Sequence, residues 1–163
     1  MSDAASLRLL KTEILNDLEA AADIRHRLDP VLARIPMPDA TQGEVVHAAY
    51  LLHNVYNAWE SILRRVATAF ENELKPDQWH EALLRRMTLT IPGVRPAVID
   101  ERLRAQLDEL RKFRHFFRHS YAVKLEAGRI EALGDRWRAI DPAFRQAVGR
   151  FLEILDDMIT RSS

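Results

Sequence analysis

The sequence predicts an all-α protein, an antiparallel up-down bundle of four or five helices. Apolar residues recur at steps of three and four along most of the 163 residues, and only five Gly and seven Pro interrupt them. This spacing places apolar side chains on one face of a helix, while the scarcity of Gly and Pro argues against a turn-rich β-sandwich. The length fits one domain, spanning residues 1–163.

The N-terminal half of the sequence predicts two long helices. A first helix is expected over about residues 4–28, because Asp29–Pro30 should break or restart it. A capping box of Thr41 and Glu44 then opens a second helix. The second helix carries the longest stripe in the chain: Val45, Ala49, Leu52, Tyr56, Trp59, Leu63, Val66 and Phe70. A second, adjoining stripe predicts that this helix is central and contacts several neighbours.

Three further helices follow from the same signals. A short helix is expected over about residues 76–87, followed by a loop over 88–98 that is rich in Pro and Gly. Asp100 should N-cap a helix over about 101–119, and Asp141–Pro142 should open the last helix, which continues to about 158. Only the region of Val123 and Leu125 suggests an extended segment.

Composition excludes several classes of function. The chain has no Cys, so disulfides, thiolate zinc sites and a cysteine nucleophile are ruled out. Lys and Arg total 24, equal to Asp and Glu, so the protein lacks the overall positive field of a general nucleic-acid binder. Because no apolar run reaches membrane-spanning length and charges appear early, we expect a cytoplasmic protein without membrane association.

One helix breaks the apolar pattern. The stripe at positions 103, 107, 110, 114, 117 and 121 reads Leu, Leu, Leu, Arg, Phe, Tyr. Burying the Arg114 guanidinium is costly unless it is paired or reached by solvent through a cleft. Seven Lys or Arg face two acidic residues from Arg102 to Lys124, with two His and several aromatic residues among them. Such a patch suits an RNA phosphodiester, although basic residues also stabilise helix C-termini and Phe stripes usually form core.

The spacing constrains how this patch could act. On an ideal helix Arg114 and His119 lie about 140° apart, so one straight helix cannot direct both at the same phosphate. Either the helix ends or bends near His119, or two copies of the chain meet. We favour a two-fold homodimer, the commonest oligomer. From the second helix, Glu60 could pair with the basic patch, and His53 and Asn54 could line its cleft.

The run Arg114–Tyr121 resembles the R-x4-H-x-Y signature of HepT-type toxins in the HEPN superfamily. Flanking segments are also similar: LHNVYNAWESIL at 52–63, DQWHEALLRRM at 77–87 and LDELRKFRHFFRHSY at 107–121. The resemblance spans about residues 44–157. It implies a HEPN-type helical homodimer that acts as a metal-independent endoribonuclease. It also implies a toxin–antitoxin pair with an MNT-type nucleotidyltransferase that can transfer AMP to Tyr121.

The residue types suit that chemistry. Arg114 would bind the phosphate and stabilise its transition-state charge, while His119 would transfer protons, since histidine titrates near neutral pH. His115, Arg118 and Ser120 are expected to play supporting roles. Tyr121 lies about 20° from Arg114 on the helix, so an AMP phosphate there would neutralise the guanidinium. No cofactor and no metal are expected.

Three other interpretations remain open. His115 and His119 have the i,i+4 spacing of a shared metal, and Glu44 with His47 forms a Glu-x-x-His, but the remaining ligands of a di-iron site are missing. The main alternative function is a non-catalytic HEPN dimer that binds nucleotide, RNA or a protein. A third is an antitoxin or chaperone-like partner that docks through the basic segment.

Overall fold

The computed structural model describes residues 3–71, 79–119 and 124–162. Within these ranges the chain forms five helices: α1 (Ala4–Arg34), α2 (Gln42–Glu71), α3 (Trp79–Met87), α4 (Glu101–His119) and α5 (Ala127–Arg161). The only extended pairing in the described part is an isolated antiparallel bridge between Ile91 and Arg95. The all-α prediction is therefore confirmed.

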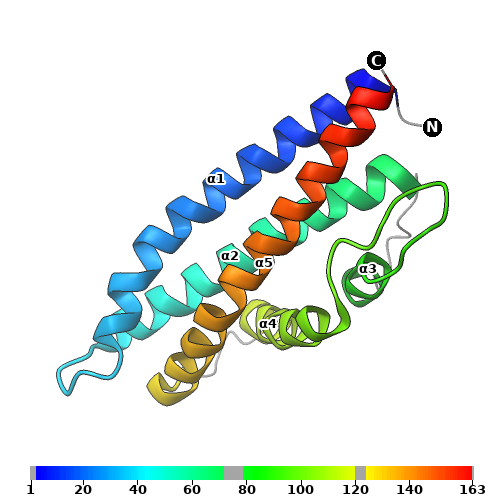
Figure 1. The fold of residues 1–163 in the computed structure, drawn as a ribbon. Helices are drawn as coiled ribbons and strands as arrows, with labels where there is room; N and C mark the ends of the chain where they lie inside the picture. The colour runs from blue at the N-terminus through cyan, green and yellow to red at the C-terminus, as the bar shows by residue number, and fades with distance from the viewer. Residues whose placement is uncertain (1–2, 72–78, 120–123, 163) are drawn as a thin grey trace.

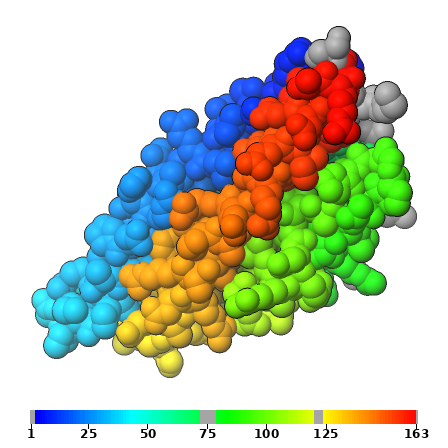
Figure 2. All heavy atoms as spheres, in the orientation of Figure 1, coloured from blue at the N-terminus to red at the C-terminus, as the bar shows by residue number. Residues whose placement is uncertain are grey.

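The bundle is built around a long antiparallel hairpin of α1 and α2 (Figure 1). Helix α5 packs on both, and its end lies beside the start of α1, where Lys11 Nζ is 2.6 Å from Asp156 Oδ1. Helix α4 packs against α2 and α5, and the short α3 packs against α2 and α4. On the face seen in Figure 2, α5 runs between α1 on one side and the α3–α4 half on the other.

Helix α2 is the centre of the core, as its two apolar stripes predict. It contacts each of the other four helices, and its residues from Val45 to Ala67 supply much of the buried core. Trp59 stacks on Phe144 of α5, with ring centroids 4.7 Å apart. A helix packed on several sides is held rigidly, so polar groups that it carries are well placed.

Two of the predicted helix starts are confirmed. The backbone N–H of Thr41 donates to Glu44 Oε2 at 2.7 Å, while the N–H of Glu44 donates to Thr41 Oγ1 at 3.2 Å, which completes the capping box. At α4, the N–H of Leu103 donates to Asp100 Oδ1 at 2.7 Å. Helix α4 begins and ends where the sequence predicts.

The two proline signals are wrong as helix boundaries. Pro30 lies inside α1, which continues to Arg34, and Pro142 lies inside α5, which begins at Ala127. A proline inside a helix removes one hydrogen bond and costs about 3 kcal/mol. Burial of the apolar residues on either side, each worth about 1.5–3 kcal/mol, offsets that cost. These residues are Leu28 and Leu32 in α1 and Ile140 and Phe144 in α5.

Side chains near these prolines explain why the helices stay continuous. The buried carboxylate of Asp141 lies 3.0 Å from Arg145 and 3.5 Å from Arg25 of α1, and so it serves in ion pairs instead of an N-cap. Leu32 packs directly over Gly134 of α5, where any Cβ would collide with its methyl groups.

Of the segment expected to be extended, Val123 lies outside the described residues. Leu125 belongs to no helix or strand, and its carbonyl accepts a hydrogen bond from Gln42.

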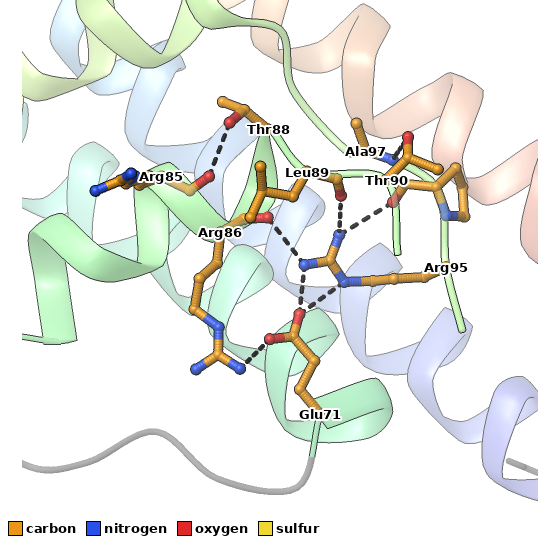
Figure 3. Close-up of polar contacts among 9 residues, drawn as sticks. Glu71, Arg85, Arg86, Thr88, Leu89, Thr90, Arg95 and Ala97 are labelled. Carbon is orange, nitrogen blue, oxygen red and sulfur yellow. Dashed lines mark hydrogen bonds and ion pairs between the residues drawn. The ribbon is translucent and has the colours of Figure 1, made fainter. Parts of the chain in front are cut away.

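The loop between α3 and α4 is fixed by a turn and a buried arginine. Residues 91–94 form a turn in which the N–H of Val94 donates to the carbonyl of Ile91 at 3.0 Å, with Gly93 at φ 74°. The side chain of Arg95 is fully buried and bonds to Glu71 and to three carbonyl groups, those of Leu89, Pro96 and Arg86 (Figure 3). Glu71 also pairs with Arg86. The ends of α2 and α3 and the loop are thus tied together.

No helix in the described ranges combines the length and apolar character needed to cross a bilayer.

Candidate active site

Arg114 lies in the seam between α2 and α4, with a side chain only 13% exposed. Its Nε donates to Asn57 Oδ1 of α2 at 2.5 Å. Its Nη2 is 3.8 Å from Glu60 Oε1, close enough for electrostatic attraction but beyond hydrogen-bonding distance. As the sequence predicts, Arg114 interrupts an apolar stripe of α4, whose members Leu107 and Leu110 are buried.

Glu60 is shared between two helices that flank it. Its carboxylate is 6% exposed, and Oε2 accepts a hydrogen bond from His80 Nδ1 of α3 at 2.7 Å. Glu60 therefore connects an imidazole of α3 with the guanidinium of α4. Among the residues that the structure describes, only one of the five N–H donors of the Arg114 guanidinium forms a hydrogen bond, the one to Asn57, so Arg114 is not held in a closed pair there.

A depression of about 270 Å³ opens beside this guanidinium. Its wall is formed by Asn57, Glu60, Ser61, Arg64, Trp79 and Arg114. Three helices thus supply the wall: α2 contributes four residues, α3 contributes Trp79 and α4 contributes Arg114. An anionic group can reach Arg114 from this side.

Most of these neighbours were missed by sequence reasoning. Glu60 was expected to be able to pair with the basic patch and does, whereas Asn57, Ser61, Arg64 and Trp79 were not assigned to a site. A signal was present: polar residues recur on α2 at positions 53, 57, 60 or 61, and 64, at helical spacing. This polar stripe faces Arg114, while the apolar stripes of α2 face the core.

His53 and Tyr56 border the same seam. Burial lowers the pKa of His53, and the nearby charges of Arg114 and Arg118 lower it further. The hydrogen bond that His53 Nδ1 donates to Asn54 Oδ1 and the charge of Glu60 act in the opposite direction. The His53 imidazole also lies against Phe117, with ring centroids 5.3 Å apart. Burial raises the pKa of Tyr56, and the charge of Glu60 adds to that effect. Both side chains therefore favour their neutral forms, so the charges beside the depression are those of Arg114, Arg64 and Glu60.

The other motif residues lie on a different face of α4. His115 and His119 are exposed, with ring centroids 4.3 Å apart. His119 donates through Nδ1 to the carbonyl of His115 at 2.7 Å, because a carbonyl oxygen can only accept. In this tautomer of the neutral ring Nε2 is the acceptor, and no described residue donates a hydrogen bond to it. Arg118 is exposed in the last turn, and Ser120 and Tyr121 lie outside the described residues.

The chain by itself does not bring Arg114 and His119 to one point. Helix α4 includes His119, and its ring contacts His115 on the face opposite the core, whereas Arg114 is turned toward α2. The angular separation derived from the sequence thus persists in the folded chain.

A family model described as "HepT-like protein" matches residues 47–155, which include every residue of the site from His53 to His119. This chain is a HepT-like protein of the HEPN superfamily. Comparisons with curated proteins and with solved structures found no significant match. The resemblance that rests on residues 44–157 is therefore confirmed at the level of the family.

The sequence also left open a metal site, either at His115 and His119 or at Glu44 and His47. Three or more His, Asp or Glu side chains do not gather into a potential metal site anywhere in the described ranges. His115 also lines a second, larger groove of about 960 Å³. The charged and imidazole side chains of this groove are His80, His115, three arginines (Arg85, Arg104 and Arg111) and two glutamates (Glu81 and Glu101). The charges around His115 are thus mixed, because Arg104 pairs with Glu101 and Arg111 pairs with Asp108.

Proposed function

We propose that this HepT-like protein is a metal-independent endoribonuclease, the toxin of a type II toxin–antitoxin system that acts in the cytoplasm. The observation that carries the proposal is the placement of Arg114. Its guanidinium is held by Asn57 and Glu60 in the seam between α2 and α4 and is largely shielded from solvent, yet it borders an open depression. A preorganised guanidinium in a partly dry site stabilises charge on phosphorus more strongly than one in bulk water.

The reaction would be transesterification within single-stranded RNA. A base removes the proton of a 2′-hydroxyl, whose oxygen forms a bond to the adjacent phosphorus as the bond to the 5′-oxygen breaks. An acid protonates the departing oxygen, which leaves a 2′,3′-cyclic phosphate and a free 5′-hydroxyl. Atoms and protons balance without a metal or other co-reactant. His119, with Nε2 unoccupied, supplies the proton transfer, and Arg114 stabilises the extra charge on phosphorus.

A homodimer would complete this site. In one chain, Arg114 and His119 lie on different faces of α4, so a two-fold arrangement is needed to bring a second His119 toward the phosphate. His115 and Arg118 would flank the cleft as supporting residues, together with Ser120. The second histidine would then act as the acid partner of the first.

The simplest test uses wild-type protein purified without its antitoxin. Incubated with single-stranded RNA in EDTA, it should release fragments with cyclic phosphate ends and should spare DNA of the same sequence, which has no 2′-hydroxyl. Expression without the partner should also arrest growth, whereas an antitoxin would not. Intact RNA under these conditions would contradict the proposal and favour the non-catalytic binding module.

Inactivation would occur by AMPylation of Tyr121, catalysed by an MNT-type nucleotidyltransferase antitoxin. Tyr121 is seven positions after Arg114, about two helical turns. If α4 continued to Tyr121, an adenylyl phosphate there would lie on the same side of the helix and neutralise the guanidinium. Co-expression with the nucleotidyltransferase should add one adenylyl group, detected by intact mass. Tyr121→Phe should abolish the adduct, while Tyr50→Phe, at a half-exposed tyrosine of α2, should retain it. An unmodified wild-type chain would count against this mechanism.

A further inference from the structure

The depression beside Arg114 has a wall that the cleavage chemistry does not use. Ser61 and Arg64 lie one turn apart on α2, and Trp79 opens α3 across from them. The Cζ of Arg64 lies 5.8 Å from the centre of the Trp79 ring, a cation–π distance. Arg64 and the indole of Trp79 therefore lie in contact, next to Arg114, which we propose binds the phosphate.

The charge of this depression is unbalanced. Two guanidinium groups, Arg64 and Arg114, face a single carboxylate, Glu60, which already accepts a hydrogen bond from His80. In the described ranges Arg64 forms no ion pair and is exposed, unlike Arg65 beside it, which pairs with Glu13 and Asp17. An unpaired arginine beside a second one attracts an anion with more than one phosphate, as in a nucleic-acid strand.

Trp79 differs from the other tryptophans of the chain. Trp59 and Trp137 are each 1% exposed and belong to the core, whereas Trp79 is only partly buried and borders the depression. Stacking of unpaired bases on exposed aromatic rings is a general mode of single-strand binding. Asn57 and Ser61 add polar groups to the same wall.

We propose that Arg64 and Trp79 extend the Arg114 site into a subsite for one nucleotide of single-stranded RNA. The base stacks on Trp79, and the phosphate next to the one held by Arg114 pairs with Arg64. This subsite rests on the proposed function, because it takes the strand bound at Arg114 to be the RNA substrate. It also gives a role to the first residues of α3, because Trp79 lines the depression and His80 bonds to Glu60.

Tryptophan fluorescence tests this subsite without relying on cleavage. The probe is a short single-stranded 2′-O-methyl RNA, which lacks the nucleophilic hydroxyl and cannot be cut. Because the other two tryptophans are buried, saturable quenching by this probe reports Trp79. We expect quenching in the wild type and none in Trp79→Phe, which keeps an aromatic ring. The affinity of a labelled probe, measured by anisotropy, should fall at least about 5-fold in Trp79→Ala and in Arg64→Ala.

The control is Arg150→Ala, which removes an exposed arginine of α5 that borders none of the cavities described above. Its affinity for the probe should match the wild type. Equal affinities for the Arg64 and Arg150 variants, or wild-type fluorescence that the probe does not quench, would overturn the subsite. If the probe binds through Arg64 and Trp79 but ordinary RNA stays intact, the proposed cleavage fails and the subsite stands. If RNA is cut while neither variant changes binding, the subsite alone is wrong.

Discussion

Replacing Arg114 by alanine should lower the rate of RNA cleavage by about 10²–10³, the usual loss when one preorganised charge-stabilising donor is removed. Asn57 and Glu60 fix the guanidinium before substrate arrives, so the loss should fall mainly on the catalytic step. Arg114→Lys keeps the charge, but one ammonium group cannot both bond to Asn57 and offer a phosphate the two parallel N–H donors of a guanidinium. It should therefore recover only part of the rate.

His119→Ala should lower the same rate by about 10²–10⁴, the range for loss of a positioned proton-transfer group. The side chain is exposed, and its one hydrogen bond within the described ranges is to the carbonyl of His115, so its removal should leave the fold intact. Rates are measured in single-turnover cleavage of a labelled RNA in EDTA.

Matched controls separate catalysis from general effects of charge. Lys112→Ala removes an exposed cation from α4, and His26→Ala removes an exposed histidine from α1. Both should cleave at nearly the wild-type rate. Circular dichroism melting establishes that each variant folds. If folded Arg114→Ala and His119→Ala cut RNA as fast as the wild type, the catalytic assignment is wrong.

The helices could be predicted from the sequence because their signals are local. The stripe of α2 and the caps at Thr41 and Asp100 depend on residues within a few positions of each other, and all three are confirmed. The signals at Pro30 and Pro142 are equally local but failed, because packing between α1 and α5 outweighs one lost hydrogen bond. Nothing near Pro142 in the sequence reveals that Asp141 pairs with Arg25, more than a hundred residues earlier.

In the site, too, features within one helix could be predicted, whereas contacts between helices could not. Arg114 was recognisable because it interrupts a stripe on its own helix. Its partners Asn57 and Glu60 lie on α2, and His80 lies on α3, so their association depends on how three helices cross. Trp79 could be assigned to the start of a short helix, but its difference in exposure from Trp59 and Trp137 is visible only in the folded chain.

Replacing Arg95 by methionine should have the largest effect on stability, lowering the free energy of unfolding by about 3–5 kcal/mol. The Arg95 side chain is completely buried, where it pairs with Glu71 and bonds to the carbonyls of Leu89, Pro96 and Arg86 (Figure 3). Methionine fills a similar volume but cannot donate hydrogen bonds. The buried carboxylate of Glu71 therefore loses one ion-pair partner, and the three carbonyl groups lose the N–H donors of Arg95. Urea denaturation, followed by circular dichroism, measures the loss.

Arg85→Met is the matched control, because Arg85 is an exposed arginine of the same region, on α3. It should change the free energy of unfolding by no more than about 0.5 kcal/mol. The double variant Glu71→Gln with Arg95→Met should be less destabilised than the sum of the two single variants, since the amide removes the uncompensated charge. Equal stability of the Arg95 and Arg85 variants would show that the buried network contributes nothing.

The Arg95 network also bears on the site, because it fixes the end of α3. Trp79 and His80 lie at the start of this nine-residue helix, and Arg86, whose carbonyl binds Arg95, lies at its end. A helix this short is not stable by itself, so its position depends on such anchors. Arg95→Met should therefore weaken binding of the 2′-O-methyl RNA probe even where most molecules remain folded, whereas Arg85→Met should reduce it less. If Arg95→Met destabilises the chain but leaves the affinity unchanged, α3 is held in place by its contacts with α2 and α4 alone.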